Sequence, residues 1–220
     1  MKSKIQLVMF DFDGTLVDTA PDLIRATNRF LESKGVEALP ESRIRREIGR
    51  GLKRLLAQVV PDELKKEENL PQLEKEFLEV YDQEVLNTPV LYEGALEFLE
   101  EYEGRIAILS NKRERFIKKI LGHLGLDRLP WVGVIGGDTL ANMKPHPEPF
   151  LHVLALAGLD PEEAVIVGDG QPDVVGALGV GMRSIAVDFG YTSSEELMGL
   201  GATYAIESFH ELFPLLKSIT

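Results

Sequence analysis

The stretch Leu7–Thr19, LVMFDFDGTLVDT, decides the fold of this chain. Residues 4–10 predict a short buried strand, because they are mostly apolar, lack helical periodicity and end abruptly in charge. Asp11 and Asp13 follow this strand and lead into an Asp-Gly turn. Two carboxylates at the end of a buried strand repel each other and lose hydration, so they require a cation or a proton unless the turn is solvated.

The composition is that of an ordinary globular protein. A length of 220 residues suffices for one large domain or a domain with an insertion. The net charge of −12 argues against general nucleic-acid binding and against anchoring to an anionic membrane. The chain has no cysteine, which excludes disulfides and thiolate chemistry. Because we find neither a signal-peptide pattern nor an apolar run near the roughly 20 residues of a membrane span, we expect a cytoplasmic protein.

Two kinds of pattern divide the chain. Apolar periodicity predicts helices over 18–34, over 40–60 with an interruption at Gly49-Arg50-Gly51, and over 71–86, with no strand between 17 and 88. From residue 93 onward, helices alternate with short apolar strands, the last of them at 202–206. We therefore predict an α/β fold. A Rossmann-like core, 1–16 and 89–220, has a mostly parallel sheet with helices on both faces, and an all-helical cap, 17–88, is inserted after the first strand.

Polar residues gather where the predicted strands end. In a parallel sheet, ligands bind outside the carboxyl ends of the strands. These ends read DFDGT at 11–15, SNK at 110–112, GGD at 136–138, GDG at 168–170 and DFG at 188–190. Carboxylates without nearby histidine or cysteine favour Mg²⁺, which proteins usually hold through few acidic side chains and substrate phosphate. The sequence therefore predicts a magnesium site at this edge of the sheet.

Four motifs carry a resemblance to a known family. DFDGTLVDT, SNK, KPHPEPF and GDGQPD occur in the order and approximate spacing of the four motifs of the haloacid dehalogenase-like (HAD) hydrolase superfamily. The chain resembles that superfamily over nearly its whole length, and the block 17–88 resembles its smaller helical cap. DTAPDL followed by IGRGLKRLL is most similar to the phosphoglycolate phosphatase branch. The resemblance implies an enzyme that hydrolyses phosphomonoesters.

The resemblance implies distinct roles for the two acids of the first motif. Asp11 matches the nucleophile that forms an aspartyl-phosphate, and it is also a Mg²⁺ ligand in this family. Asp13 matches the general acid that protonates the leaving alkoxide and later activates water as a base. The main-chain carbonyl at the position of Asp13 usually completes the metal shell in the family.

The remaining motifs imply phosphate and metal contacts. Ser110 and the backbone of Asn111 match the phosphate-binding second motif, and Lys144 matches the catalytic lysine of the third. Asp169 matches a Mg²⁺ ligand, and Asp173 matches the carboxylate that supports the metal and the lysine.

The sequence departs from the family pattern at two places. Gly170 stands where serine or threonine is frequent, and Pro172 restricts the backbone just before Asp173. Whether Asp173 reaches the metal is therefore left open. Leu23 occupies the position where the mutase branch carries a catalytic histidine on its cap, which argues against a phosphosugar mutase.

The leading interpretation is a Mg²⁺-dependent phosphatase for a small phosphorylated metabolite, with 2-phosphoglycolate first. Arg50, between two glycines, would pair well with a substrate carboxylate. The basic run 43–54 fits a solvated helix face equally well. The alternatives are a phosphatase for pyrophosphate, nucleotides or sugar phosphates, a 2-haloacid dehalogenase, and a phospho-accepting receiver module. The dehalogenase needs neither Asp13 nor Asp169, and a receiver module needs no helical insertion. The oligomeric state is left open.

Overall fold

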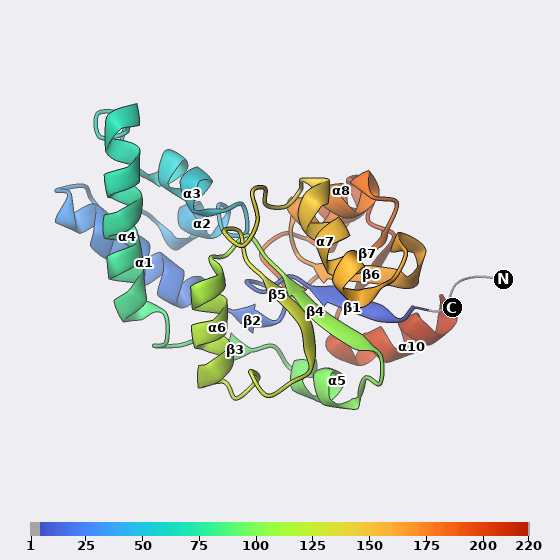
Figure 1. Ribbon diagram of the computed structural model, residues 1–220. Helices are drawn as coiled ribbons and strands as arrows, with labels where there is room; N and C mark the ends of the chain where they lie inside the picture. Colours follow the sequence, from blue (N-terminus) through green and yellow to red (C-terminus); the bar gives the residue numbers. More distant parts are fainter. Residues whose placement is uncertain (1–4, 220) are drawn as a thin grey trace.

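The computed structural model describes residues 5–219, so Lys4 of the predicted first strand lies outside the described part. Strand β1 (Leu7–Phe10) lies at the centre of a six-stranded sheet with the order β5-β4-β1-β6-β7-β8 (Figure 1). The other strands are β4 (Arg105–Leu109), β5 (Trp131–Ile135), β6 (Ala164–Gly168), β7 (Arg183–Val187) and β8 (Tyr204–Ile206). Every adjacent pairing in this sheet is parallel, which confirms the predicted α/β fold.

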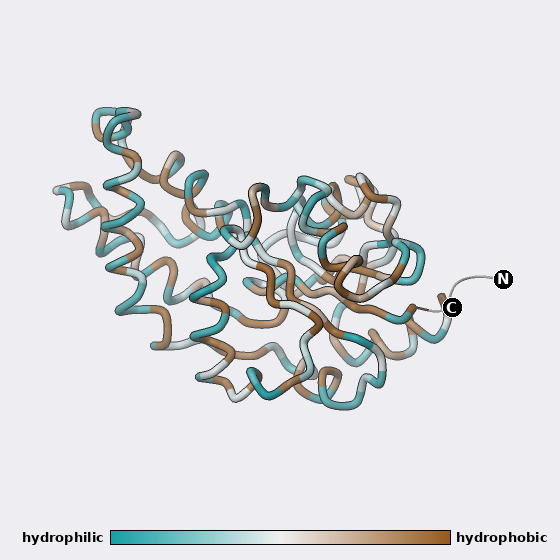
Figure 2. Tube along the Cα trace, in the orientation of Figure 1, coloured by the Kyte–Doolittle hydropathy of each residue, from teal (hydrophilic) through white to brown (hydrophobic). Residues whose placement is uncertain are grey.

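The side chains of β1 point alternately into two apolar clusters. Val8 and Phe10 belong to one cluster, and Leu7 and Met9 belong to the other. The first cluster receives α5 (Ala95–Glu101), α6 (Glu114–His123) and α10 (Leu212–Ser218), and the second receives α7 (Pro147–Ala157) and α8 (Gln171–Gly179). Helices therefore cover both faces of the sheet, and Figure 2 shows the hydrophobic residues concentrated along the strands between them.

The cap helices α1–α4 lie together beside the sheet (Figure 1). They are α1 (Ala20–Ser33), α2 (Glu41–Arg45), α3 (Leu52–Val59) and α4 (Leu70–Glu84). Helices α1 and α4 pack against each other, and the rings of Phe30 and Phe77 meet edge to face with 5.7 Å between their centroids. Gly49 and Gly51 have φ values of 84° and 89°, which other residues rarely adopt. The helical conformation is therefore interrupted between α2 and α3, as predicted.

A short strand pair corrects one expectation about this region. Strand β2 (Val17–Asp18) pairs antiparallel with β3 (Val90–Leu91), and the pair ties together the two segments that join the cap helices to the sheet. The prediction of no strand between 17 and 88 was therefore wrong at its first two residues, because a strand of two residues is too short to show periodicity.

Several shorter helices complete the described part of the chain. They are α9 (Ser194–Gly199) and the 3₁₀ helices η1 (Glu67–Asn69), η2 (Pro161–Glu163) and η3 (Phe209–Glu211). Helix α9 packs on β7 and β8 and was not predicted. Among residues 5–219, no helix combines the length and the apolar character needed to cross a membrane.

Candidate active site

The central strands of the sheet deliver three motif residues to one edge. Strands β4 and β6 flank β1, so Ser110, Asp11 and Asp169 follow neighbouring strands. The backbone N–H of Asp11 donates to the carbonyl of Val167 at 2.9 Å, which holds the chain against β6 just after β1 ends. The parallel pairing thus brings segments far apart in the sequence to the same place.

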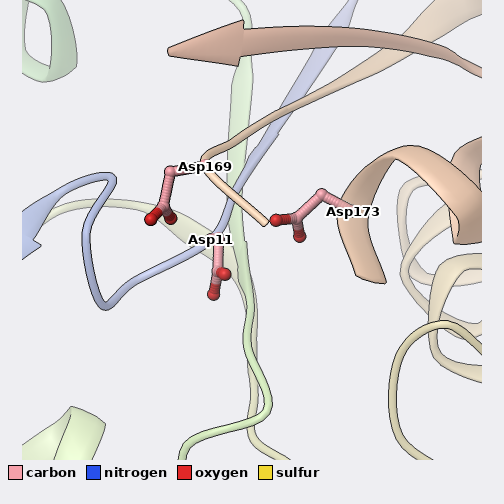
Figure 3. Close-up of side chains that lie close together, drawn as sticks. All are labelled: Asp11, Asp169 and Asp173. Carbon is pink, nitrogen blue, oxygen red and sulfur yellow. The ribbon is translucent and has the colours of Figure 1, made fainter. Parts of the chain in front are cut away.

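Three buried carboxylates converge at this edge (Figure 3). One oxygen each of Asp11, Asp169 and Asp173 lies within 4.8 Å of the others. Asp173 comes from the first turn of α8, where the N–H that Pro172 lacks would have no partner in the helix. The Gly170 N–H donates to the Asp173 carboxylate at 3.1 Å. The departures from the family pattern therefore leave Asp173 directed into the cluster.

The backbone around Asp169 fixes its side chain. A Cβ on Gly14 would lie 2.3 Å from Asp169 Oδ2, and one on Gly190 would lie 2.1 Å from Asp169 Cβ. The Thr15 hydroxyl donates to Asp169 Oδ1 at 2.9 Å, and the Tyr191 N–H donates to Oδ2 at 2.8 Å. Two close backbone approaches and two hydrogen bonds thus hold this carboxylate in one orientation.

Lys144 is the cation inside the acidic cluster. Its Nζ lies 2.5 Å from Asp173 Oδ1 and 3.1 Å from Asp11 Oδ1, and its side chain is only 1% exposed. Burial lowers the pKa of Lys144, but Asp11 and Asp173 outweigh it, so the pKa stands above its ordinary value and the ammonium stays charged. One ammonium against three carboxylates leaves two negative charges, which one divalent cation would balance.

The pKa values of the carboxylates reflect the same excess of negative charge. Burial, together with the charge of Asp11, raises the pKa of Asp169 to about 8 and that of Asp173 to about 7. A buried acid with such a pKa must bind a proton or a cation at neutral pH. The donor set consists of oxygen atoms held in fixed positions, which suits Mg²⁺. The residues therefore fit the ion that the sequence predicts, and Asp11, Asp169 and Asp173 are the carboxylates that could hold it.

Asp13 points to other partners. Its carboxylate does not belong to the cluster of Asp11, Asp169 and Asp173. Asp13 Oδ1 accepts a hydrogen bond from the Thr19 hydroxyl at 2.5 Å and lies 2.9 Å from Lys112 Nζ. The side chain of Asp13 thus lies outside the acidic cluster, and its acid and base role and the metal contact of its main chain stay predictions.

The second motif connects the sheet to the cap helices. Ser110 is 4% exposed, and its hydroxyl accepts a hydrogen bond from the Lys112 N–H at 3.3 Å. The Asn111 side-chain amide donates to the carbonyls of Lys144 and Gly49, both at 3.0 Å. Asn111 thus joins two core motifs to the loop between α2 and α3.

Lys112, the last residue of the SNK motif, is a functional candidate that sequence reasoning missed, and it is buried beside Asp13. Its side chain is 4% exposed, and Nζ donates to the Tyr81 hydroxyl of α4 at 2.6 Å. Burial lowers the pKa of Lys112, but the charge of Asp13 and the contacts with Tyr81 raise it by more. The pKa therefore stands above its ordinary value, and Lys112 remains protonated. The sequence could have indicated Lys112, because it stands at a strand end.

Tyr191 is a second residue that sequence reasoning missed. Besides its N–H contact with Asp169, its hydroxyl accepts hydrogen bonds from the N–H groups of Thr19 and Ala20, both at 3.0 Å. The guanidinium of Arg45 lies 5.5 Å from the centre of its ring. Tyr191 therefore links the metal side of the site to the start of α1 and to α2. The sequence could have indicated Tyr191, because it directly follows DFG, residues 188–190, at the end of a predicted strand.

Arg50 lies on the same side of the site as Asp169. It is half-buried and borders a cavity together with Asp169, Gly170 and Gln171. Within residues 5–219 it makes no hydrogen bond or ion pair. Asp13 and Lys112 border a different cavity. Arg50 thus borders the same cavity as Asp169 of the acidic cluster, and its predicted contact with a substrate carboxylate stays a prediction.

The parallel sheet, the acidic cluster and the buried lysine define a haloacid dehalogenase-like hydrolase. The model of the family described as "Haloacid dehalogenase-like hydrolase" matches residues 8–187, and the chain belongs to this family. A phosphoglycolate phosphatase from Chromobacterium violaceum is 34% identical over 97% of both chains. Phosphoglycolate phosphatase 1 from Pseudomonas aeruginosa is 36% identical over 95% of this chain and 79% of its own length.

Solved structures agree with the fold. A crystal structure described as a predicted phosphoglycolate phosphatase from Haemophilus somnus is 27% identical, with a TM-score of 0.88 over 96% of this chain and 97% of the other. A haloacid dehalogenase-like family hydrolase from Streptococcus pneumoniae is 22% identical and shares the fold, with a TM-score of 0.85 over 96% of this chain and 98% of the other.

Proposed function

We propose that this chain is a Mg²⁺-dependent phosphomonoester hydrolase that acts on a small phosphorylated acid, with 2-phosphoglycolate as the first candidate. The observation that carries the proposal is the convergence of Asp11, Asp169 and Asp173 around Lys144 at the end of β1. The two relatives named phosphoglycolate phosphatase support the choice of substrate. A cytoplasmic location and the lack of nucleic-acid partners remain predictions from the composition.

Asp11 acts as the nucleophile in this proposal. The Phe12 N–H donates to Asp11 Oδ1 at 2.6 Å, and Lys144 Nζ lies 3.1 Å from the same oxygen, so the carboxylate is oriented before substrate arrives. A carboxylate oxygen of Asp11 attacks phosphorus, the bond to the ester oxygen breaks, and an aspartyl-phosphate forms. Lys144 and the N–H groups after β4 then face the negative charge of the phosphoryl group.

Asp13 handles the protons in both halves of the reaction. As an acid it protonates the departing ester oxygen, and as a base it takes a proton from the water that hydrolyses the aspartyl-phosphate. Asp11, Asp169 and the main chain of Asp13 would hold Mg²⁺, with Asp173 in support. The ion would neutralise the acidic cluster and draw the anionic phosphoryl group towards Asp11.

Other phosphorylated substrates remain second candidates. The residues that face the phosphoryl group do not distinguish 2-phosphoglycolate from pyrophosphate, a nucleotide or a sugar phosphate. A receiver module would accept one phosphoryl group without turnover. The helical insertion beside the sheet, which a receiver module would not need, favours an enzyme (Figure 1).

Phosphate release from 2-phosphoglycolate tests the proposal. We expect multiple turnovers with Mg²⁺, none in EDTA, and recovery when Mg²⁺ is restored. Asp11→Asn should lower turnover on the order of 10⁴-fold or more, because no nucleophile remains. Asp188→Asn, which changes an exposed aspartate at the end of β7, is the matched control and should keep the activity. Turnover by Asp11→Asn at the parent rate, or a single stoichiometric phosphorylation, would refute the enzyme proposed here.

A further inference from the structure

A small cavity lies between the cap helices and Asp13. It measures about 60 Å³, which is room for about four water-sized groups. Apolar side chains from α1, α3, α4 and α6 form most of its wall: Leu23, Leu52, Leu55, Phe77 and Phe116. Four charged residues also line it: Asp13, Lys112, Glu47 and Arg113. A leaving group that enters this space exchanges water for largely apolar walls, with the Lys112 ammonium beside Asp13.

Lys112 presents its charge in a constrained position. Nζ lies 2.9 Å from Asp13 Oδ1, 2.6 Å from the Tyr81 hydroxyl and 4.8 Å from the centre of the Tyr81 ring. The side chain is 4% exposed, so solvent screens it little. Tyr81 belongs to α4 and is itself 3% exposed. A core residue and a cap helix together therefore fix this cation at the cavity wall.

The direction of the leaving group follows from Asp13. Under the proposed function, the ester oxygen must come within hydrogen-bonding distance of Asp13 to be protonated. The rest of the leaving group then extends into the cavity that Asp13 shares with Lys112. Arg50 borders the other cavity, beside Asp169 and Gly170. Arg113 lines the same cavity as Lys112, but it pairs with Glu74 at 3.3 Å and with Asp138 at 3.6 Å. Lys112 is thus the best placed of these cations to meet an anionic group on the leaving side.

We propose that Lys112, held by Tyr81, binds a carboxylate on the leaving group and selects short 2-phosphooxy carboxylic acids. This inference rests on the proposed function. Because Lys112 Nζ is one hydrogen-bond length from Asp13, it meets a carboxylate carried on the carbon next to the ester oxygen. A longer acid would place its carboxylate against Leu52, Leu55 or Phe77, where burial of a charge is unfavourable. An uncharged alcohol would leave the ammonium without a substrate partner.

A pair of esters that differ in one charge tests the proposal. We expect Lys112→Met to lower the ratio of kcat/KM for 2-phosphoglycolate to that for ethyl phosphate by about tenfold or more. The loss should appear mainly as a higher KM for 2-phosphoglycolate. Lys112→Arg keeps the charge and should restore part of the ratio. Tyr81→Phe keeps the ring but loses the hydroxyl contact, so it should lower the ratio in the same direction by a smaller factor even where Lys112→Met does not fold.

The same assay separates the competing explanations. Equal losses on both esters in Lys112→Met and in Tyr81→Phe would show that Lys112 serves only Asp13, and this would overturn the inference. A ratio that falls in Arg50→Ala but not in the Lys112 variants would assign the carboxylate to Arg50 instead. A parent protein that hydrolyses neither ester would refute the proposed function and the inference with it. Parent turnover with an unchanged ratio in the variants would refute the inference alone.

Discussion

The acidic residues of the site carry more negative charge than their surroundings can stabilise. Asp169 and Asp173 are 4% and 1% exposed, and Lys144 supplies the positive charge between Asp11 and Asp173. The pKa values of Asp169 and Asp173 rise to about 8 and about 7 because burial and the charge of Asp11 disfavour further ionisation. The local charge imbalance, and not only the oxygen donors, favours a divalent cation.

The stabilisation of the protein by Mg²⁺ should therefore grow with pH. In the unfolded chain these aspartates lose their protons near pH 4, whereas the folded metal-free protein keeps them up to about pH 7–8. The metal-free protein thus loses stability as the pH rises from about 4 to about 8, and bound Mg²⁺ replaces the protons of these aspartates. Each displaced proton makes Mg²⁺ affinity rise by up to about tenfold per pH unit.

Thermal unfolding with and without Mg²⁺ at pH 6 and pH 8 measures this effect. The increase in Tm caused by a fixed Mg²⁺ concentration should be larger at pH 8. Asp169→Asn removes one titrating ligand, so the increase should be smaller and should depend less on pH. An equal increase at both pH values in the parent protein would show that these aspartates do not bind protons in competition with the metal.

Helices α1 and α4 are joined by a buried acid. Glu84 is 4% exposed and accepts hydrogen bonds from Arg29, from Arg25 Nε at 2.8 Å and from Asn87 Nδ2 at 2.6 Å. Burial raises the pKa of Glu84, but Arg29 and Arg25 outweigh it and hold the pKa below its usual range. The two arginine side chains are 49% and 41% exposed, so solvent screens part of the attraction.

Glu84→Gln should destabilise the protein by about 1–3 kcal/mol at pH 7, because charged hydrogen bonds are replaced by neutral ones. A lowered pKa stabilises the folded state above the unfolded pKa of about 4, and this contribution is lost as the pH falls through the folded pKa. The difference between parent and variant should therefore shrink in acid. Urea unfolding at several pH values measures it, with Glu79→Gln on the exposed face of α4 as the control. A difference that does not change with pH would contradict the ionic role of Glu84.

At the scale of elements, the sequence predicted the segments with strong periodicity. The helices of the cap and the strands of the sheet were found within a few residues, because a stripe of apolar residues or a short buried run is a local signal. Strands β2 and β3 and helix α9 were missed, since two to six residues provide too little periodicity. Their positions depend on tertiary contacts that no local pattern encodes.

The site shows the same division. The strand ends of a parallel sheet must converge, so Asp11, Ser110 and Asp169 could be brought together from the sequence alone. The contact between Lys112 and Tyr81 could not be predicted from the sequence, because Tyr81 reaches Lys112 from a helix of the cap. Tyr191 was missed for a similar reason, since its contacts with Thr19 and Ala20 join segments far apart in the chain.

Across the whole molecule, the cap helices and the sheet share one continuous apolar cluster. The ring centroids of Tyr81 on α4 and Phe116 on α6 are 4.8 Å apart. The Asn111 side chain donates a hydrogen bond to the Gly49 carbonyl across the same boundary between the cap and the core. Opening the cap would have to break these contacts and the bond between Lys112 and Tyr81. In the function and the inference proposed above, substrate is selected at this boundary and the phosphoryl chemistry takes place at the end of β1.

The central claim, a phosphoryl group carried by Asp11, is tested most directly in the Asp13→Asn variant with p-nitrophenyl phosphate and Mg²⁺. Nitrophenolate leaves without protonation, so the intermediate forms, but its hydrolysis lacks the base. We predict a burst of about one nitrophenolate per protein molecule. Borohydride added after the burst should convert Asp11, and no other aspartate, to homoserine, which mass spectrometry of the peptide containing 7–19 would detect. A linear time course with Asp11 unmodified, or reduction at Asp13, would contradict the account.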